Sequence, residues 1–232
     1  LAGPKLGLMK AIIAGGGTGG HLFPGIAVAR EIQRRYPQSE ILFVGADQGI
    51  EARLVPKEGF PLRTLPIGGL KGMGLQRKAK NAVSMMGAVF RARSILSEFK
   101  PDVVIGVGGY ASFPMLAAAI MGGFPRVIME QNAIPGLANR VLGKRVDFAA
   151  ITDPRTRDFF GDRGVVTGNP VRPAFKSIAP KVHAAPYTIL VFGGSQGAQA
   201  INKAILEALA FLSDLKSDLR FVHQTGERQI DE

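Results

Sequence analysis

The sequence predicts an α/β protein with two Rossmann-like domains, each built on a parallel sheet. Short apolar segments alternate with helical segments along most of the 232 residues, a pattern typical of parallel strands that helices cover on both faces. Several of the apolar segments end directly in glycine-rich turns. Because ligands of such sheets bind beyond the carboxyl ends of the strands, these turns mark the predicted binding edge.

The first domain is predicted to span 9–166. Its strands are expected where short apolar runs end in glycine or polar residues, at 10–14, 41–44, 103–107, 126–130, 148–151 and 165–166. Its helices are expected where apolar residues recur at helical spacing, at 24–36, 77–99, 114–121 and 137–144, with one more ending near 59. A glycine-rich loop at 68–74 precedes the longest of these helices.

A stretch rich in proline and alanine, 167–186, is predicted to be a linker. Residues 1–8 are expected to be a cloning scar or a short leader, since no apolar segment follows a basic one there. The second domain is expected to begin at 187 with a strand, a helix and another strand, at 188–192, up to about 212 and at 219–223. A doubly wound domain usually needs on the order of 100 residues or more, so we expect this domain to be truncated at residue 232.

The composition excludes several kinds of chemistry. The chain has no cysteine, which rules out disulfides, thiolate catalysis and cysteine-based zinc sites. The three histidines are scattered along the sequence, so we expect no metal site. The formal net charge of +11 favours an anionic partner. Nucleic acid is disfavoured as that partner, because the basic stretch 70–100 has few aromatic side chains and the chain has no tryptophan.

Two segments bear on a membrane. The longest uncharged run, 103–125, is broken by glycines and by Pro114, and it predicts a strand, a turn and a helix instead of a membrane span. The predicted helix 77–99 mixes basic with apolar residues and follows an apolar loop, which fits a surface on an anionic bilayer. The alternative for this helix is packing on the core with a solvated basic side.

Three glycine-rich turns carry the functional argument. The first, 15–20, has the spacing G-x-G-x-x-G, which alone is a weak sign of phosphate binding. A dinucleotide site is disfavoured, because glycine and alanine follow Val44 where an acidic residue should close the second strand. A tight turn without a ligand is the other alternative. Similar turns at 108–112 and 193–198 place the pattern in both domains and predict a cleft with a phosphate-bearing ligand on each side.

Three side chains near these turns are candidates for chemistry. His21 lies at a helix start, and we interpret it either as a general base, or else as a hydrogen-bond donor to phosphate or a partner in a hydrogen bond at the helix start. Glu130 ends a strand and is either a sugar-binding or acid–base group, or else a helix cap or a buried hydrogen-bond partner. Arg172 follows a Gly-Asn-Pro turn and either clamps a phosphate or is a solvated linker residue.

Five motifs together resemble one family: GTGGH at 17–21, VGGYAS at 107–112, EQN at 130–132, TGNPVR at 167–172 and GGSQGA at 193–198. In this order they resemble the MurG-type enzymes of peptidoglycan synthesis, the UDP-N-acetylglucosamine–N-acetylmuramyl-(pentapeptide) pyrophosphoryl-undecaprenol N-acetylglucosamine transferases. The resemblance implies a GT-B fold, in which two Rossmann-like domains face each other across a cleft. It also implies an inverting transfer of N-acetylglucosamine from UDP-N-acetylglucosamine to the 4-hydroxyl of the lipid-linked N-acetylmuramyl-pentapeptide, which converts lipid I to lipid II without a cofactor.

The same resemblance implies a peripheral protein at the cytoplasmic face of the bacterial inner membrane. Its partners would be UDP-N-acetylglucosamine, undecaprenyl-pyrophosphoryl-N-acetylmuramyl-pentapeptide and an anionic membrane surface, and not nucleic acid. A related UDP-sugar enzyme and a non-catalytic module that binds anions or membranes are the alternatives. The family's C-terminal segment, which carries uracil and ribose contacts, is missing from these 232 residues, so we expect this form to bind UDP-sugar poorly.

Individual residues match functional positions of the family. His21 and Glu130 are the candidates for the catalytic base, in that order. Positions that match donor contacts are Thr18, Gly19, Gly20, Asn132, Arg172 and Ser195. Positions that match acceptor, diphosphate or cleft contacts are Gly109, Tyr110, Ala111, Ser112, Asn139, Gly194, Gln196, Gly197 and Asn202.

Overall fold

The computed structural model describes residues 8–67, 75–175, 177–180, 183–194 and 197–226. The chain forms two compact units that divide between Lys176 and Ser177, within the stretch predicted as a linker. The first unit extends beyond its predicted end because Arg172 packs against Phe23 and ties the start of that stretch to the unit. The predicted glycine-rich loop 68–74 lies outside the described residues.

A seven-stranded parallel sheet forms the first unit, and every strand predicted there is confirmed. The strands are β1 (Lys10–Gly15), β2 (Glu40–Ala46), β3 (Leu62–Leu65), β4 (Val103–Gly108), β5 (Arg126–Glu130), β6 (Phe148–Ile151) and β7 (Gly164–Val166). They lie in the order β3-β2-β1-β4-β5-β6-β7. The strand order therefore reverses between β1 and β4, and such a switch point is where parallel sheets bind their ligands.

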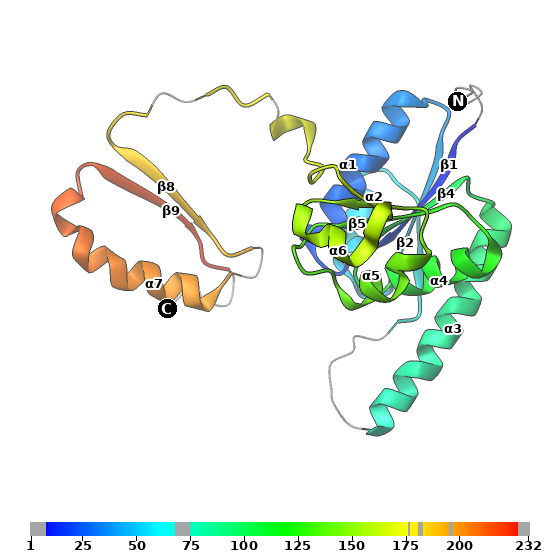
Figure 1. Ribbon diagram of the computed structural model, residues 1–232. Helices are drawn as coiled ribbons and strands as arrows, with labels where there is room; N and C mark the ends of the chain where they lie inside the picture. The colour runs from blue at the N-terminus through cyan, green and yellow to red at the C-terminus, as the bar shows by residue number, and fades with distance from the viewer. Residues whose placement is uncertain (1–7, 68–74, 176, 181–182, 195–196, 227–232) are drawn as a thin grey trace. The chain divides into compact units, whose positions relative to one another are not determined.

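Helices cover both faces of this sheet (Figure 1). They are α1 (Gly19–Arg35), α2 (Ile50–Lys57), α3 (Leu75–Phe99), α4 (Ser112–Gly122), α5 (Leu137–Leu142) and α6 (Arg157–Phe160). Short 3-10 helices lie in the connections, namely η1 (Gly143–Arg145), η2 (Pro154–Thr156), η3 (Gly161–Arg163) and η4 (Pro173–Phe175). β4 and α4 occupy the uncharged run 103–125, as predicted, and among the described residues no helix is long and apolar enough to cross a bilayer.

Two apolar cores lie on opposite faces of the sheet because successive side chains of a strand point to opposite faces. Ile12 packs in the core that includes residues of α3, α4 and α5, whereas its neighbour Ile13 packs in the core of α1 and α2. Val104 and Ile105 of β4 divide in the same way. The two central strands are thus held from both sides, which fixes the edge where their turns meet.

The predicted start of the first helix at residue 24 was wrong, since α1 begins at Gly19. Thr18 is extended (φ −138°, ψ 157°), and its carbonyl accepts a hydrogen bond from the backbone N–H of Leu22 at 3.1 Å. Pro24 therefore lies inside the helix and not at its first position, where proline is usually found. As a result, Gly19, Gly20 and His21 form the first helical turn; the His21 N–H also donates to the Thr18 carbonyl, at 3.3 Å, whereas those of Gly19 and Gly20 precede the first hydrogen bonds of the helix.

The second unit is a strand–helix–strand segment. β8 (Tyr187–Phe192) pairs in parallel with β9 (Leu219–Gln224), and α7 (Gln199–Leu209) with η5 (Ala210–Leu215) connects them. The predicted strands are confirmed, and the α-helix ends earlier than predicted because its last residues turn into a 3-10 helix. Leu190 and Phe192 stay exposed on one face of this sheet.

Gly106 offers a test of how tightly α4 packs on β4. A Cβ at this position would come within 2.6 Å of Ser112 Oγ and 3.0 Å of Leu116 Cγ. We expect Gly106→Ala to lower the free energy of unfolding by about 1–3 kcal/mol, the usual cost of overpacking, in urea unfolding followed by circular dichroism.

The matched control is Gly87→Ala on the exposed side of α3, where a Cβ would meet nothing within 4 Å. Alanine forms helices more readily than glycine, so the free energy of unfolding of this variant should rise by up to about 1 kcal/mol. Equal stability of the two variants would contradict the described packing of α4.

Candidate functional site

The first two glycine-rich turns meet where β1 and β4 end. The backbone N–H of Gly16 donates a hydrogen bond to the carbonyl of Gly108 at 3.1 Å. Gly16 and Gly109 have φ values of 142° and 80°, and a Cβ on Gly109 would overlap the backbone of Gly16. Only residues without a side chain fit two turns that approach so closely. The glycines thus bring the start of α1 and the start of α4 to a single place.

His21 stands against the second turn. A Cβ on Gly108 would come within 2.7 Å of His21 Nδ1, so the imidazole ring lies directly on this glycine. Nδ1 lies 3.2 Å from Gln131 Oε1. The amide oxygen can only accept, which places the ring proton on Nδ1 and the lone pair on Nε2. With this tautomer, assigned from the hydrogen bond, Nε2 is the atom that can accept a proton from a substrate.

Glu130 ends β5, and its carboxylate is 2% exposed. Oε1 accepts hydrogen bonds from the backbone N–H and the side-chain Nδ2 of Asn132, both at 2.9 Å. Oε2 accepts from the backbone N–H of Gly136 at 3.1 Å and from Asn139 Nδ2 at 2.9 Å. Both oxygens are engaged within the protein, which favours the interpretation of Glu130 as a buried hydrogen-bond partner. Its acid–base role stays a prediction.

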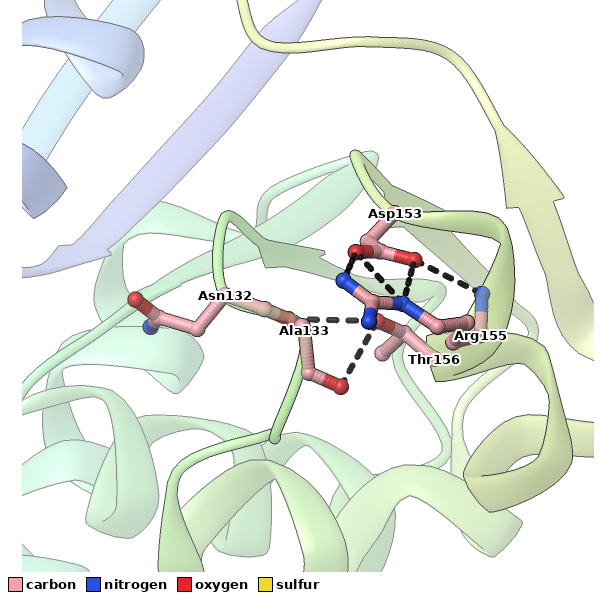
Figure 2. Close-up of polar contacts among 5 residues, drawn as sticks. All are labelled: Asn132, Ala133, Asp153, Arg155 and Thr156. Atoms are coloured by element: carbon pink, nitrogen blue, oxygen red, sulfur yellow. Dashed lines mark hydrogen bonds and ion pairs between the residues drawn. The ribbon is translucent and has the colours of Figure 1, made fainter.

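The loop that carries Asn132 is also held from its other side (Figure 2). The buried hydroxyl of Thr156 donates a hydrogen bond shared between the carbonyls of Asn132 (3.1 Å) and Ala133 (3.2 Å). Asp153 accepts from the backbone N–H of Arg155 at 2.8 Å and fixes the turn before Thr156. The Arg155 side chain, together with that N–H, lowers the pKa of Asp153 to about 2. Asn132 is therefore anchored by Glu130 of β5 and by Thr156 of η2.

A pocket of about 550 Å³ lies in the first unit, lined by residues of α1, α3, α4, β5 and α5 and by the second glycine-rich turn. Its polar wall contains predicted site residues, namely His21, Gly109, Tyr110, Glu130, Asn132 and Asn139. Its apolar wall contains Met85, Phe113, Leu137 and Val141. Predicted site residues 111 and 112 do not line this pocket, since both are buried at the start of α4. The pocket therefore combines an apolar lining with a small number of polar groups, as binding pockets for small molecules commonly do.

The predicted donor residues of the first unit lie around the start of α1. Thr18 and Gly20 are exposed there, and the first turn of this helix carries no acidic residue. The guanidinium of Arg172 stacks over the rings of Phe23 (5.0 Å) and Phe175 (5.4 Å), so it is not a freely solvated linker residue. Its positive charge and the helix N-terminus together favour an anion at this place.

The third turn belongs to the second unit. Gly194 and Gly197 have φ values of 87° and 73°, and a Cβ on Gly197 would overlap the carbonyl of Thr225. Asn202 is buried, and its Nδ2 donates to that same carbonyl at 2.9 Å while its Oδ1 lies 3.0 Å from His223 Nε2. Asn202 therefore ties α7 to the end of β9 beneath the turn. Predicted site residues 195 and 196 lie outside the described residues.

Sequence reasoning missed two residues that shape the first unit's site. Gln131 was part of a motif but had no assigned role, although it orients His21. Glu51 was not considered, although its carboxylate accepts a hydrogen bond from the first turn. Each of these residues contacts a group far away in the sequence. The only sequence signal was that Gln131 belongs to the motif at 130–132; nothing comparable pointed to Glu51.

Two family models match the chain. The model of the glycosyltransferase family 28 N-terminal domain matches residues 11–151, and that of the family 28 C-terminal domain matches residues 188–232. Both matches fall within the two compact units.

The chain is also similar to individual proteins. It is 45% identical over 227 residues to a protein of Thermodesulfovibrio yellowstonii and 50% identical over 224 residues to one of Citrifermentans bemidjiense. Both carry the name UDP-N-acetylglucosamine–N-acetylmuramyl-(pentapeptide) pyrophosphoryl-undecaprenol N-acetylglucosamine transferase. The alignments cover 94% and 95% of the chain and 62% and 63% of the relatives. The crystal structure of Acinetobacter baumannii MurG is 32% identical, with a TM-score of 0.73, over 96% of this chain and 62% of that one.

The role of Glu130 as an anchor can be tested by Glu130→Gln, which turns one acceptor oxygen into an amide group that faces donors of the loop. We expect the free energy of unfolding to fall by about 1–3 kcal/mol, because buried donors lose their acceptor. Hydrogen exchange of the Asn132 and Gly136 amides should accelerate. As a control, Glu98→Gln alters an exposed carboxylate that is paired with Arg63. Its free energy of unfolding should stay within about 0.5 kcal/mol of the parent's. Unchanged protection of both amides in Glu130→Gln would contradict the anchor role.

Proposed function

The chain belongs to glycosyltransferase family 28, and on that ground we propose that it serves an inverting transfer of N-acetylglucosamine. The donor would be UDP-N-acetylglucosamine, and the acceptor the 4-hydroxyl of a lipid-linked N-acetylmuramyl-pentapeptide, so that lipid I becomes lipid II. The similarity to transferases of that name supports this choice over another UDP-sugar enzyme. Since the chain spans about 62% of those relatives, the proposal concerns a protein with a complete second unit.

The observation that carries the proposal is the pocket at the switch point of the first unit. Its polar wall combines the second glycine-rich turn with His21, and its apolar wall lies on α3, α4 and α5. A lipid-linked sugar diphosphate has a matching division into an anionic and an apolar part. We therefore assign the acceptor to this pocket, with its diphosphate near the turns.

His21 is the group that we propose as the base. The acceptor's hydroxyl oxygen forms a bond to the anomeric carbon of the donor sugar while the bond from that carbon to the UDP oxygen breaks. The hydroxyl proton moves to His21 Nε2, and the electron pair of the broken bond leaves with UDP. Gln131 supports this step because it keeps the proton of the neutral ring on Nδ1.

The donor side of the proposal rests on the starts of helices. Amide groups at a helix N-terminus stabilise the charge that accumulates on departing UDP, and this requires no cofactor. The third turn, with Gly194 and Gly197 before α7, supplies such a place in the second unit. Thr18, Arg172 and Asn132 are the residues of the first unit that we propose as further contacts of the donor.

The surface around the acceptor pocket also supports attachment to a membrane. Met86 and Phe90 on α3 and Leu137 on α5 expose 60%, 70% and 71% of their area. On the opposite side of α3, Ala92 and Ile95 are buried in the core, so that the helix packs on the protein and still presents apolar side chains. We propose that this surface meets the anionic cytoplasmic face of the inner membrane, where a lipid-linked acceptor resides.

Substitution of His21 tests the mechanism. In a form of the protein extended to a complete second unit, His21→Ala should reduce turnover by about 10²–10⁴-fold, the contribution of a general base, with the KM for the donor little changed. Labelled UDP-N-acetylglucosamine and a lipid acceptor analogue give the measurement. His183→Ala, at an exposed position before β8, is the control. Unchanged turnover in His21→Ala would remove His21 from the chemistry, and an inactive extended parent would refute the transfer itself.

Substitution of Phe90 tests the membrane surface. Phe90→Ser should lower the affinity for vesicles of phosphatidylglycerol and phosphatidylethanolamine, measured by sedimentation, by about ten- to a hundredfold, since burying one aromatic side chain is worth about 1.5–3 kcal/mol. Phe211→Ser removes an even more exposed ring from the second unit and should leave sedimentation unchanged. Equal effects of both substitutions would show that the chain associates with vesicles through nonspecific hydrophobic contacts and not through a defined surface.

A further inference from the structure

A buried carboxylate lies against the first glycine-rich turn. Glu51, in the first turn of α2, is 1% exposed. Its Oε2 accepts a hydrogen bond from the backbone N–H of Gly17 at 2.7 Å, and its Oε1 accepts from that of Ala46 at 2.9 Å. Among the described residues, no lysine or arginine forms an ion pair with it. Burial of a carboxylate is costly, so these two hydrogen bonds are its main compensation.

The Glu51 side chain is closely surrounded by backbone, which restricts it to one position. A Cβ on Gly16 would come within 2.5 Å of the carboxyl carbon of Glu51. Cβ atoms on Gly45 and Gly49 would also overlap the Glu51 side chain. Glycines from the first turn, from β2 and from the start of α2 therefore enclose this carboxylate. Its position in turn fixes the direction of the Gly17 N–H.

The turn itself needs such support. Gly15, Gly16 and Gly17 have φ values of 137°, 142° and 81°, three successive conformations that other residues rarely adopt. Gly15 is held by the pairing of β1 with β4, Gly16 by its hydrogen bond to the second turn, and Gly17 by its hydrogen bond to Glu51. The amides that follow, at the start of α1, are then the ones that remain to bind an anion.

We propose that Glu51 is a positioning residue that holds the first glycine-rich turn in its diphosphate-binding form. The inference rests on the proposed function for the identity of the ligand as a diphosphate. Glu51 acts through the turn and touches neither substrate nor reacting atoms. It should therefore control the binding of the acceptor and not the rate of the chemical step.

Glu51→Gln separates positioning from charge. Glutamine offers one acceptor oxygen where two N–H groups, those of Gly17 and Ala46, need one each, so the bridge between the turn and the end of β2 loses one of its two hydrogen bonds. It also removes a negative charge beside an anion site, which by electrostatics alone would tighten anion binding. Positioning predicts weaker binding of inorganic pyrophosphate to the Glu51→Gln chain, by about tenfold in calorimetric titration.

The matched control is Glu58→Gln, which removes the same charge just after α2, where Glu58 pairs with Arg30 on the surface. This variant should bind pyrophosphate as the parent does. The Gly17 amide proton resonance should move upfield in Glu51→Gln only. Glu51→Asp keeps both acceptor oxygens on a shorter side chain. Its affinity for pyrophosphate should therefore lie between that of the parent and that of Glu51→Gln. It also supplies the readout if Glu51→Gln does not fold.

Several outcomes would overturn the inference. Pyrophosphate binding by Glu51→Gln equal to or tighter than that of Glu58→Gln would show that Glu51 does not position the turn. A parent chain that binds no pyrophosphate would show that the turn is not a diphosphate site. In the extended protein, Glu51→Gln should raise the KM for the lipid acceptor at nearly constant kcat. If the extended parent transfers no sugar, the proposed function fails, while the pyrophosphate comparison still decides the role of Glu51.

Discussion

The hydrogen bond between the Gly16 N–H and the Gly108 carbonyl is the contact on which the site depends. It joins the ends of the two central strands, β1 and β4, at the point where the strand order reverses. From there α1 leads to one face of the sheet and α4 to the other, as their places in the two apolar cores show. Two helices that cover opposite faces of the sheet therefore start next to this one hydrogen bond.

Close approach of two turns demands glycine, and glycine alone leaves a turn without side chains to hold it. One buried carboxylate, Glu51, supplies that support to the first turn, and a second, Glu130, holds the neighbouring loop after β5. Glu51 accepts from the first turn and from the end of β2, and Glu130 accepts from the loop after β5. A carboxylate suits this task because it is an acceptor only and offers two oxygens to several N–H groups. The cost of burying it is offset when each oxygen is hydrogen-bonded, as it is in both cases.

The sequence predicts the sheet well because short apolar runs that end in glycine mark buried parallel strands. It does not predict β3, because Leu62–Leu65 at the sheet edge has two polar residues between its two leucines and so forms no apolar run. It misplaces the start of α1 because Pro24 resembles a first helical residue. The turns are visible in the sequence, whereas the support for them is not. Glu51 meets a backbone N–H 34 positions away and Gln131 meets a ring 110 positions away, and no local pattern encodes either contact.

The two units support their turns by different means, and the difference agrees with the proposed division of labour. The first turn is held by the carboxylate of Glu51, and the end of β9 beneath the third turn is held by the neutral amide of Asn202. A diphosphate that only has to be bound keeps its charge throughout the reaction and tolerates a fixed negative neighbour. A departing nucleotide gains negative charge as the bond breaks, and a nearby carboxylate would oppose that gain. A neutral anchor is therefore the better choice beneath the turn that we assign to the donor.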